Sequence, residues 1–371
     1  MALTKVTTDN INLSGNTGAL EIPTGTTGQR PGPHALDFLV VGAGGGVYGY
    51  DSPGGGGGGG VRTSFGSQSG GASTPESKFV FDTTGATSYT VTVGEGVVKL
   101  NGEDSVFASI TSLGGGYGGG GDGCGAPYNG ADGGSGGGGT GGGSFGAGSG
   151  ETGQGFAGGT GLVSAPAYPG GGGGGSGAIG QSVTSGSVCG NGGIGTIVNI
   201  LPHGTAGTIN VGEVSGTDVY YGGGGGGNTG VSASGGIGGL GGGADMPNSS
   251  YASNDGTANT GGGASGGKYG GTPCSGSAVY PKGGSGVVIL RYSSNFTLNK
   301  TGTLAEASGS PFTITDIETN DTKVSVFISG SGTVNFTGGS AAAEGMLREN
   351  TTTGKMEVYT GTTGWRALQQ T

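Results

Sequence analysis

Short runs of β-branched and aromatic residues bracket a long glycine-rich stretch of the chain. Leu36–Val41 precedes this stretch and Gly286–Tyr292 follows it. Similar runs inside it are bounded by Gly, Asp, Asn or Ser, namely Lys78–Phe81, Tyr89–Val93, Val97–Leu100, Val106–Ile110, Thr196–Leu201, Thr208–Val211 and Asp218–Tyr221. Because such runs are typical of β-strands, the pattern predicts antiparallel β-structure with very long connections.

Beyond residue 292 apolar and polar residues alternate, as in half-buried strands. Phe312–Ile317 and Lys323–Ser329 show this alternation, and Thr333–Phe336 follows them. Gly330-Ser331-Gly332 separates the last two runs and predicts a β-hairpin between them. Residues 293–339 are therefore expected to form a small all-β module.

Both termini carry shorter strand signals. Asn10–Leu13 and Ala19–Ile22 predict strands near the N-terminus. Near the C-terminus, Met346–Arg348 is expected to pair with Lys355–Tyr359 across an Asn-Thr-Thr-Thr-Gly turn, and Trp365 follows a second turn. We therefore expect an N-terminal β segment over residues 1–33 and a β-hairpin motif over residues 340–371.

Glycine occupies 104 of the 371 positions, compared with an average usage of about 7%. Such a composition is typical of flexible linkers, or of backbones that approach closely because side chains are missing. The interspersed strand-like runs favour the ordered alternative. A polyproline-II-type helix has three residues per turn and no internal hydrogen bonds, so its backbone groups must bond to neighbouring chains. We expect Gly54–Gly60, Gly170–Gly175 and Gly222–Gly227 to pack together in this way.

The predicted fold is all-β. A β-sandwich-like unit over residues 34–292 carries long glycine-rich excursions packed as polyglycine-II helices, and small β modules lie at the termini. A collagen triple helix is not expected, because the strict Gly-X-Y period is missing and the chain has only 13 prolines.

Composition also limits the function classes. Charged residues make up 10% of the chain and the net charge is −10, which argues against nucleic-acid binding because that requires clustered Lys and Arg. No apolar stretch approaches the length of a membrane span, and Met1–Asn10 has no apolar core of a signal peptide, so no membrane insertion is expected. Hydrophobic residues are only 30%, so the chain is expected to bury additional surface by self-association.

No residue pattern indicates catalysis or metal binding. The three cysteines, Cys124, Cys189 and Cys274, are too few to pair fully in a monomer and fit no zinc spacing. His34 and His203 have no Cys or Ser partner at a recognisable spacing. We expect a non-enzymatic protein with no catalytic residues, no metal and no cofactor.

Two patterns resemble proteins of tailed bacteriophages. Glu344–Leu368 resembles a short β module of tail fibres and other virion appendages, which a segment like Ala19–Pro31 often precedes directly; here the two lie at opposite ends. The glycine-rich unit resembles a phage glycine-rich domain at Phe38–Gly46, Tyr89–Gly94, Tyr221–Gly226 and Gly283–Tyr292. Some phage adhesins of this kind pack glycine runs as polyglycine-II sandwiches that display receptor-binding loops.

The resemblance implies a virion fibre or adhesin that is made in the host cytoplasm and acts on the particle surface in host attachment. Its partners would be copies of itself in a homotrimer, other virion proteins, and a host cell-surface glycan or protein. The alternative is a structural subunit that decorates a capsid or forms filaments without receptor binding. A third possibility is an ice- or surface-binding glycine protein.

Side-chain-bearing loops interrupt the glycine runs and are the expected contact regions, because rigid scaffolds commonly present recognition residues on loops. These loops are Cys124–Asn129, Leu162–Pro169, Met246–Asp255 and Thr272–Lys282. The candidate receptor-binding residues are Tyr128, Tyr168, Met246, Tyr251 and Tyr280, since tyrosine offers a large contact area at low entropic cost. Alternatively, the loops are only turns and the tyrosines cover the ends of the glycine bundle.

Overall fold

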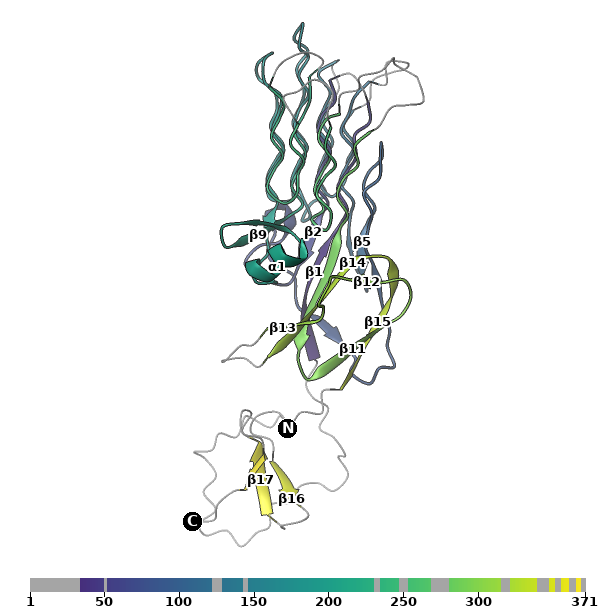
Figure 1. The fold of residues 1–371 in the computed structure, drawn as a ribbon, viewed down its shortest axis with the longest axis vertical. Helices are drawn as coiled ribbons and strands as arrows, with labels where there is room; N and C mark the ends of the chain where they lie inside the picture. The colour runs from purple at the N-terminus through teal and green to yellow at the C-terminus, as the bar shows by residue number, and fades with distance from the viewer. Residues whose placement is uncertain are drawn as a thin grey trace. The chain divides into compact units, whose positions relative to one another are not determined.

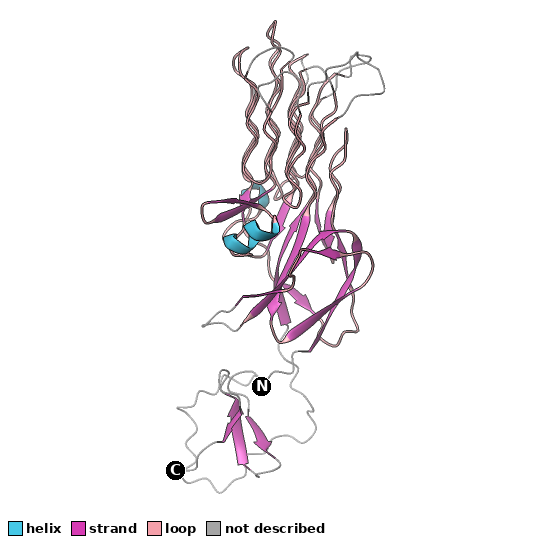
Figure 2. Ribbon diagram, in the orientation of Figure 1, coloured by secondary structure: helices cyan, strands magenta, loops and turns pink. Residues whose placement is uncertain are grey.

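The chain forms two compact units in the computed structural model, and the larger one spans His34–Thr337. The structure describes residues 34–49, 52–121, 129–142, 146–229, 234–246, 253–267, 280–314, 321–338, 347–350, 355–359 and 365–367. Strands gather at one end of the larger unit, whereas the glycine runs have no strand or helix assignment (Figure 2). The fold is all-β, as the sequence predicted.

Two antiparallel sheets form a sandwich in the larger unit (Figure 1). The seven-stranded sheet has the order β12-β14-β10-β1-β2, with β3 paired to β1 and β13 paired to β14; these strands are β1 (His34–Val41), β2 (Val61–Thr63), β3 (Phe79–Phe81), β10 (Val287–Ser293), β12 (Ala305–Glu306), β13 (Phe312–Ile314) and β14 (Thr322–Ser329). The five-stranded sheet has the order β11-β15-β4-β5-β6, formed by β4 (Tyr89–Thr92), β5 (Ser105–Phe107), β6 (Ile110–Ser112), β11 (Phe296–Lys300) and β15 (Ser331–Gly338).

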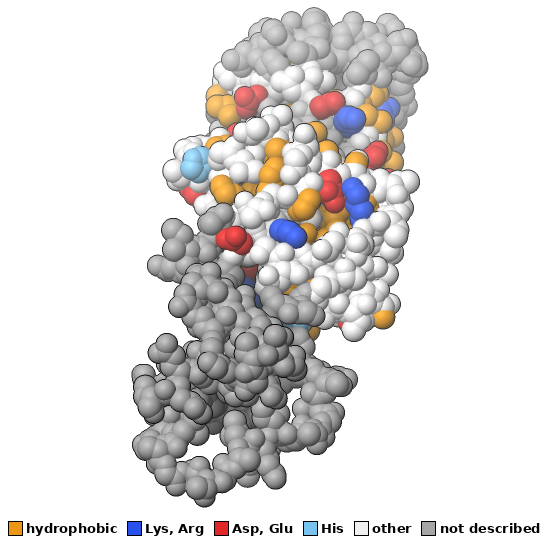
Figure 3. Space-filling model, turned by 60° about the horizontal axis from the view of Figure 1, so that its bottom comes forward, with side chains coloured by type: hydrophobic (Ala, Val, Ile, Leu, Met, Phe, Trp, Pro, Cys, Tyr) orange, Lys and Arg blue, Asp and Glu red, His pale blue; other side chains and the backbone are white. Residues whose placement is uncertain are grey.

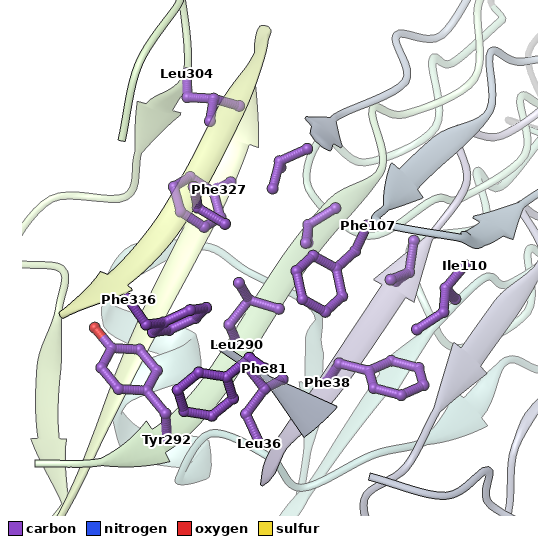
Figure 4. Packing of buried hydrophobic residues seen from close by; sticks show 14 of the residues in the cluster. Leu36, Phe38, Phe81, Phe107, Ile110, Leu290, Tyr292, Leu304, Phe327 and Phe336 are labelled. Carbon is purple, nitrogen blue, oxygen red and sulfur yellow. The ribbon is translucent and has the colours of Figure 1, made fainter. Parts of the chain in front are cut away.

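The core between the two sheets is rich in aromatic rings (Figure 4). Phe81 and Phe336 lie with ring centroids 4.3 Å apart, and Tyr292 meets Phe336 edge-on at 5.3 Å. The Tyr292 hydroxyl shares a hydrogen bond with Ser325, and burial raises its pKa. Aromatic pairs at these distances add stability beyond that of their buried area.

The opposite face of the seven-stranded sheet packs on a second apolar cluster. A small sheet of β7 (Thr196–Ile197), β8 (Glu213–Ser215) and β9 (Asp218–Tyr221), together with helix α1 (His203–Ile209), supplies the covering residues. Along β1, Phe38 faces the first cluster while Leu39 faces the second. Because both faces of β1 are buried at this end of the strand, Phe38–Val41 is a continuous apolar run instead of an alternating one.

Three of the strand predictions are wrong. Thr208–Val211 is not a strand, since α1 covers it to Ile209 and is followed by Asn210, whose φ is 52°. Val97–Leu100 forms no strand, because it makes only an isolated bridge from Val98 to Lys282 and a bond from Gly46 N–H to the Leu100 carbonyl. Tertiary contacts in these two places override a local preference for extended structure. Val106–Ile110 is not one strand, because the chain turns between β5 and β6.

Residues 293–337 belong to the sandwich and do not form a separate module. β14 pairs with β10, where Val326 lies opposite Ile289, and β15 pairs with β4, where Val334 lies opposite Tyr89. Gly330, with a φ of 86°, takes the chain from one sheet to the other, so the predicted hairpin between β14 and β15 is wrong. The sandwich needs these strands because their apolar residues complete both clusters.

The described part of the smaller unit is a three-stranded antiparallel sheet of β16 (Leu347–Asn350), β17 (Lys355–Tyr359) and β18 (Trp365–Ala367). Leu347 lies opposite Val358, and Tyr359 lies opposite Trp365. The predicted pairing across the first turn is therefore confirmed, with a third strand added. The expected strands within residues 1–33 lie outside the described residues.

Candidate functional site

The glycine runs extend side by side from one end of the sandwich (Figure 1). We call them the glycine bundle; it comprises the described residues of 42–60, 94–104, 113–195, 222–267 and 280–286. Successive N–H groups in Gly54–Gly60 bond to three different neighbours: Gly54, Gly57 and Gly60 to residues 113–119, Gly55 and Gly58 to residues 171–174, and Gly56 and Gly59 to residues 261–264. This three-residue repeat is that of a polyproline-II-type helix, which confirms the predicted polyglycine-II packing.

Three more neighbours surround the same run. The carbonyls of Gly55, Gly56 and Gly57 accept hydrogen bonds from the N–H groups of Gly138, Gly225 and Gly45, respectively. The run therefore sits in a lattice with six neighbours. Gly170–Gly175 and Gly223–Gly227 also donate to three runs each, and Gly222 donates to the Thr260 carbonyl. Backbone hydrogen bonds therefore replace side-chain packing in this part of the core.

Buried hydroxyls lie where the β-strands continue into glycine runs. Ser176 Oγ donates to the Tyr221 carbonyl at 2.7 Å and accepts from the Thr196 N–H at 2.9 Å. Ser105 Oγ similarly accepts from the Gly94 N–H at 3.0 Å. In a β-sheet a strand bonds to neighbours on two sides, whereas in the glycine bundle a run bonds to neighbours all around it. At the junction between the two, these hydroxyls pair with backbone groups that would otherwise be buried without a hydrogen bond, which would destabilise the fold.

Chain connectivity places the candidate loops at one end of the bundle. The run that follows β1 leads away from the sandwich, and the run that ends at β2 returns to it. Gly60, which directly precedes β2, bonds through its N–H to Leu113, which directly follows β6, whereas Gly54 bonds to Gly119, further along the chain. The run after β6 therefore also leads away from the sandwich. The later runs likewise lead away from the sandwich and return to it in turn, so the described residues that flank all four predicted loops lie far from the sandwich. We call this the distal end.

The structure separates the five predicted contact residues. Tyr128 and Tyr251 lie outside the described residues. Met246 is only 6% exposed and lies beside Gly235, so the expectation of an exposed contact at Met246 is wrong, because its side chain packs into the bundle. Tyr168 and Tyr280 are half-buried and remain candidates.

The loop Leu162–Pro169 is the one candidate loop that the structure describes throughout. Val163 at its tip is 57% exposed, whereas Ala167 is buried. The N–H groups of Ala167 and Tyr168 both bond to the Ser164 carbonyl, and the Thr229 hydroxyl donates to the Ala167 carbonyl. These bonds fix the loop to the adjacent run, so its exposed tip has a defined shape.

Tyr280 belongs to a cluster that the sequence did not reveal. The Lys99 ammonium lies 3.7 Å from the Tyr280 ring centroid and 5.7 Å from that of Tyr48. The Tyr48 and Tyr117 ring centroids are 5.9 Å apart. We call these four residues the tyrosine–lysine cluster. They come from four runs far apart in the sequence, so no local motif could have indicated it.

A cavity of about 320 Å³ opens on the side of the bundle, lined by Asn101, Gly102, Asp104, Leu113, Gly114, Asp132, Gly133, Ser149, Gly150 and Glu151. Asp104 Oδ1 accepts from the Gly114 N–H, and Asp132 Oδ1 accepts from the Ser149 N–H. In the part of the chain that the structure describes, no three His, Cys, Asp or Glu side chains are grouped as a metal ion requires. The carboxylates that bond here fix the backbone of neighbouring runs.

A family model described as a glycine-rich domain matches residues 17–293. This match covers well over half of the chain. The chain belongs to the glycine-rich domain family. Neither the curated proteins nor the solved structures contain a match for this chain.

The match to the glycine-rich domain ends at residue 293, yet the folded unit continues to Thr337. The last matched residue is also the last residue of β10, the strand that β14 pairs with. In this family member, the segment that follows the matched region therefore supplies five strands of the sandwich, β11 to β15.

Two adjacent runs of the glycine-rich domain have no charged residues of their own. Residues 177–195 and 234–240 contain no Lys, Arg, Asp or Glu. Hydrogen bonds from Gly177 to Ile194 and from Gly192 to Ile237 place these runs next to one another. Ile179, Ile194 and Ile237 are 62%, 48% and 63% exposed; we call this side the aliphatic face. Elsewhere charged side chains are scattered, as on the face shown in Figure 3.

The described cysteine of the glycine-rich domain is a buried thiol. Burial raises the pKa of Cys189 to about 12, so the thiolate is not populated near neutral pH. Cys124 and Cys274 lie outside the described residues. Within the described ranges, no helix has the length and apolar character needed to cross a bilayer.

Proposed function

We propose that this glycine-rich domain protein is a non-enzymatic attachment protein of a tailed-bacteriophage virion, acting as a fibre or adhesin on the particle surface. The observation that carries the proposal is the distal end of the glycine bundle. Four loops rich in Tyr and Pro join runs at that one end, and the runs themselves are held by hydrogen bonds to several neighbours. A rigid scaffold that gathers side-chain-bearing loops at one end is suited to recognition.

The terminal segments support the same proposal. Glu344–Leu368 resembles a phage tail-fibre module, and its strands form the sheet of the smaller unit. This unit would join the protein to other virion proteins or to copies of itself in a homotrimer, while the distal end meets a host glycan or protein. The protein would be made in the host cytoplasm and act on the released particle.

A structural subunit that decorates a capsid or forms filaments is the second candidate. The aliphatic face favours it, because exposed isoleucines on runs without charged residues suit packing between copies of a chain whose net charge is −10. The same side chains have another role in a monomer, since they keep additional glycine runs from joining the edge of the lattice. Measurement of cell binding separates the two functions.

Labelled full-length protein is expected to adsorb saturably to susceptible strains in a panel of bacteria. Replacing Leu162–Pro169 with a Gly-Ser turn of equal length is expected to reduce this adsorption at least about tenfold, because the exposed tip is lost while the bundle is kept. Flow cytometry across a concentration series measures the adsorption, and thermal melting checks the fold.

Replacing the exposed turn Ser215–Thr217 with Gly-Ser is the control, since this turn joins β8 to β9 at the sandwich. It should leave adsorption unchanged. Absence of saturable binding to every strain would favour the structural subunit. Full adsorption after replacement of all four candidate loops would show that the distal loops are not the binding surface.

A further inference from the structure

The tyrosine–lysine cluster contains a cation without a carboxylate partner among the described residues. The described ion pairs join Arg62 to Glu76, Lys78 to Asp37 and Lys300 to Glu306. Lys99 takes part in none of them; its ammonium instead lies over the Tyr280 ring. A cation–π contact leaves N–H donors of an ammonium group available to an anion.

A second lysine lies on the run next to Lys99. The backbone of Lys282 forms a β-bridge with Val98, the residue before Lys99, and its N–H donates to the Asp255 carboxylate at 2.9 Å. The Lys99 ammonium, which lies over the Tyr280 ring, is thus the group of this cluster that would attract an anion.

The aromatic rings specify more than charge. Tyr48 and Tyr117 lie beside each other, and the Lys99 ammonium lies close to the rings of both Tyr48 and Tyr280. Tyrosine combines an apolar ring face with a hydroxyl, so it can pack against the C–H groups of a sugar ring and bond to its hydroxyls. A nucleic acid fits this cluster less well, because its many phosphates would meet the overall negative charge.

The cluster is also preorganised. Val98 before Lys99 forms a β-bridge with Lys282, and the Leu100 carbonyl after it accepts from the Gly46 N–H at 3.1 Å, so the backbone is fixed on both sides of Lys99. Lys99 itself has a φ of 60°, a conformation that few residues other than glycine adopt. A side chain held in place before the ligand arrives loses less entropy on binding.

We propose that the tyrosine–lysine cluster binds a saccharide that carries a carboxylate. The carboxylate meets the Lys99 ammonium, and the sugar ring packs against the tyrosines. This inference rests on the proposed attachment function, for which it names a ligand class and a place on the bundle wall. It concerns the wall and not the distal loops, so the two can be tested apart.

Isothermal titration of the full-length protein with three acidic probes tests the proposal: oligogalacturonate, an oligomer of sialic acid, and a hyaluronan oligomer. Wild-type protein is expected to bind at least one of them, and to bind the neutral galactose oligomer at least about tenfold more weakly. K99Q and Y280A are each expected to weaken acidic-probe binding at least about tenfold. Y280F keeps the ring and is expected to stay within about threefold of wild type.

K78Q is the matched control, because Lys78 is an exposed cation of the sandwich in a surface ion pair. It should bind the probe as wild type does, and all variants should melt at the wild-type temperature. Binding to none of the three probes, equal binding of the neutral oligomer, or unchanged binding by folded K99Q and Y280A would each overturn the proposal.

Cell adsorption measured on the same variants keeps this inference distinct from the proposed function. Saturable adsorption that K99Q leaves intact, in protein that binds no acidic probe, would retain the attachment function and reject the saccharide site. Saccharide binding that K99Q removes, in protein that adsorbs to no strain, would retain the site and reject the attachment function.

Discussion

Replacing Gly224 with valine is expected to destroy the cooperative folding of the glycine bundle. Gly224 lies in the central run, where its N–H bonds to Gly193. A Cβ at this position would overlap the backbone of Gly173 and lie 2.6 Å from the Gly174 carbonyl oxygen. Overpacking of side-chain cores costs about 1–3 kcal/mol, but here the obstacle is backbone with bonds to several runs. We therefore expect a loss of at least about 4 kcal/mol, measured by chemical denaturation.

Gly146→Val is the matched control within the same bundle. A Cβ built at Gly146 meets nothing within 4 Å, and its φ is not in the left-handed region. This variant should keep the free energy of unfolding to within about 1 kcal/mol of wild type. Equal stability of the Gly224 and Gly146 variants would mean that the central runs do not touch as the lattice requires.

Truncation after Tyr292 is expected to abolish folding of the larger unit. The cut removes β14 and β15, which contribute Val326, Phe327 and Phe336 to the two apolar clusters. It also leaves β10 without its pairing partner. Loss of even one buried aromatic side chain costs about 3–5 kcal/mol, so loss of two core strands exceeds the usual stability of a domain. Circular dichroism during heating should show no cooperative transition.

Truncation after Gly338 provides the comparison, because it removes only the residues that follow the larger unit. This shorter protein should melt cooperatively, close to the transition that the larger unit shows in the full chain. Cooperative melting of the chain that ends at Tyr292 would restore the view that residues 293–339 form an independent module.

The central strands β1 and β10 could be predicted because burial on both faces gives them runs of consecutive apolar residues. Leu36–Val41 and Gly286–Tyr292 are the clearest cases, and β1 and β10 pair directly. The glycine runs were predictable for a related reason, since only close backbone contact makes so much glycine useful. Their hydrogen-bonded neighbours were not predictable, because each N–H bonds to a run far away in the sequence.

The errors arise where local pattern and tertiary partner differ. Alternation marked β14 and β15 as strands but could not show that Gly330 takes the chain between two sheets. Met246 resembled a loop contact, yet the bundle buries it. Lys99 drew no attention in the sequence, because its importance depends on Tyr48 and Tyr280, which only the fold brings to it.

Hydrogen–deuterium exchange of the glycine amides tests the central claim most directly. The lattice bonds the N–H groups of Gly54–Gly60, Gly170–Gly175 and Gly222–Gly227, and these runs are buried. Their exchange in the native protein should be slowed at least about a thousandfold, as in stable core strands such as β10. Exchange of these amides at the rate of an unstructured peptide, while β10 stays protected, would contradict the account.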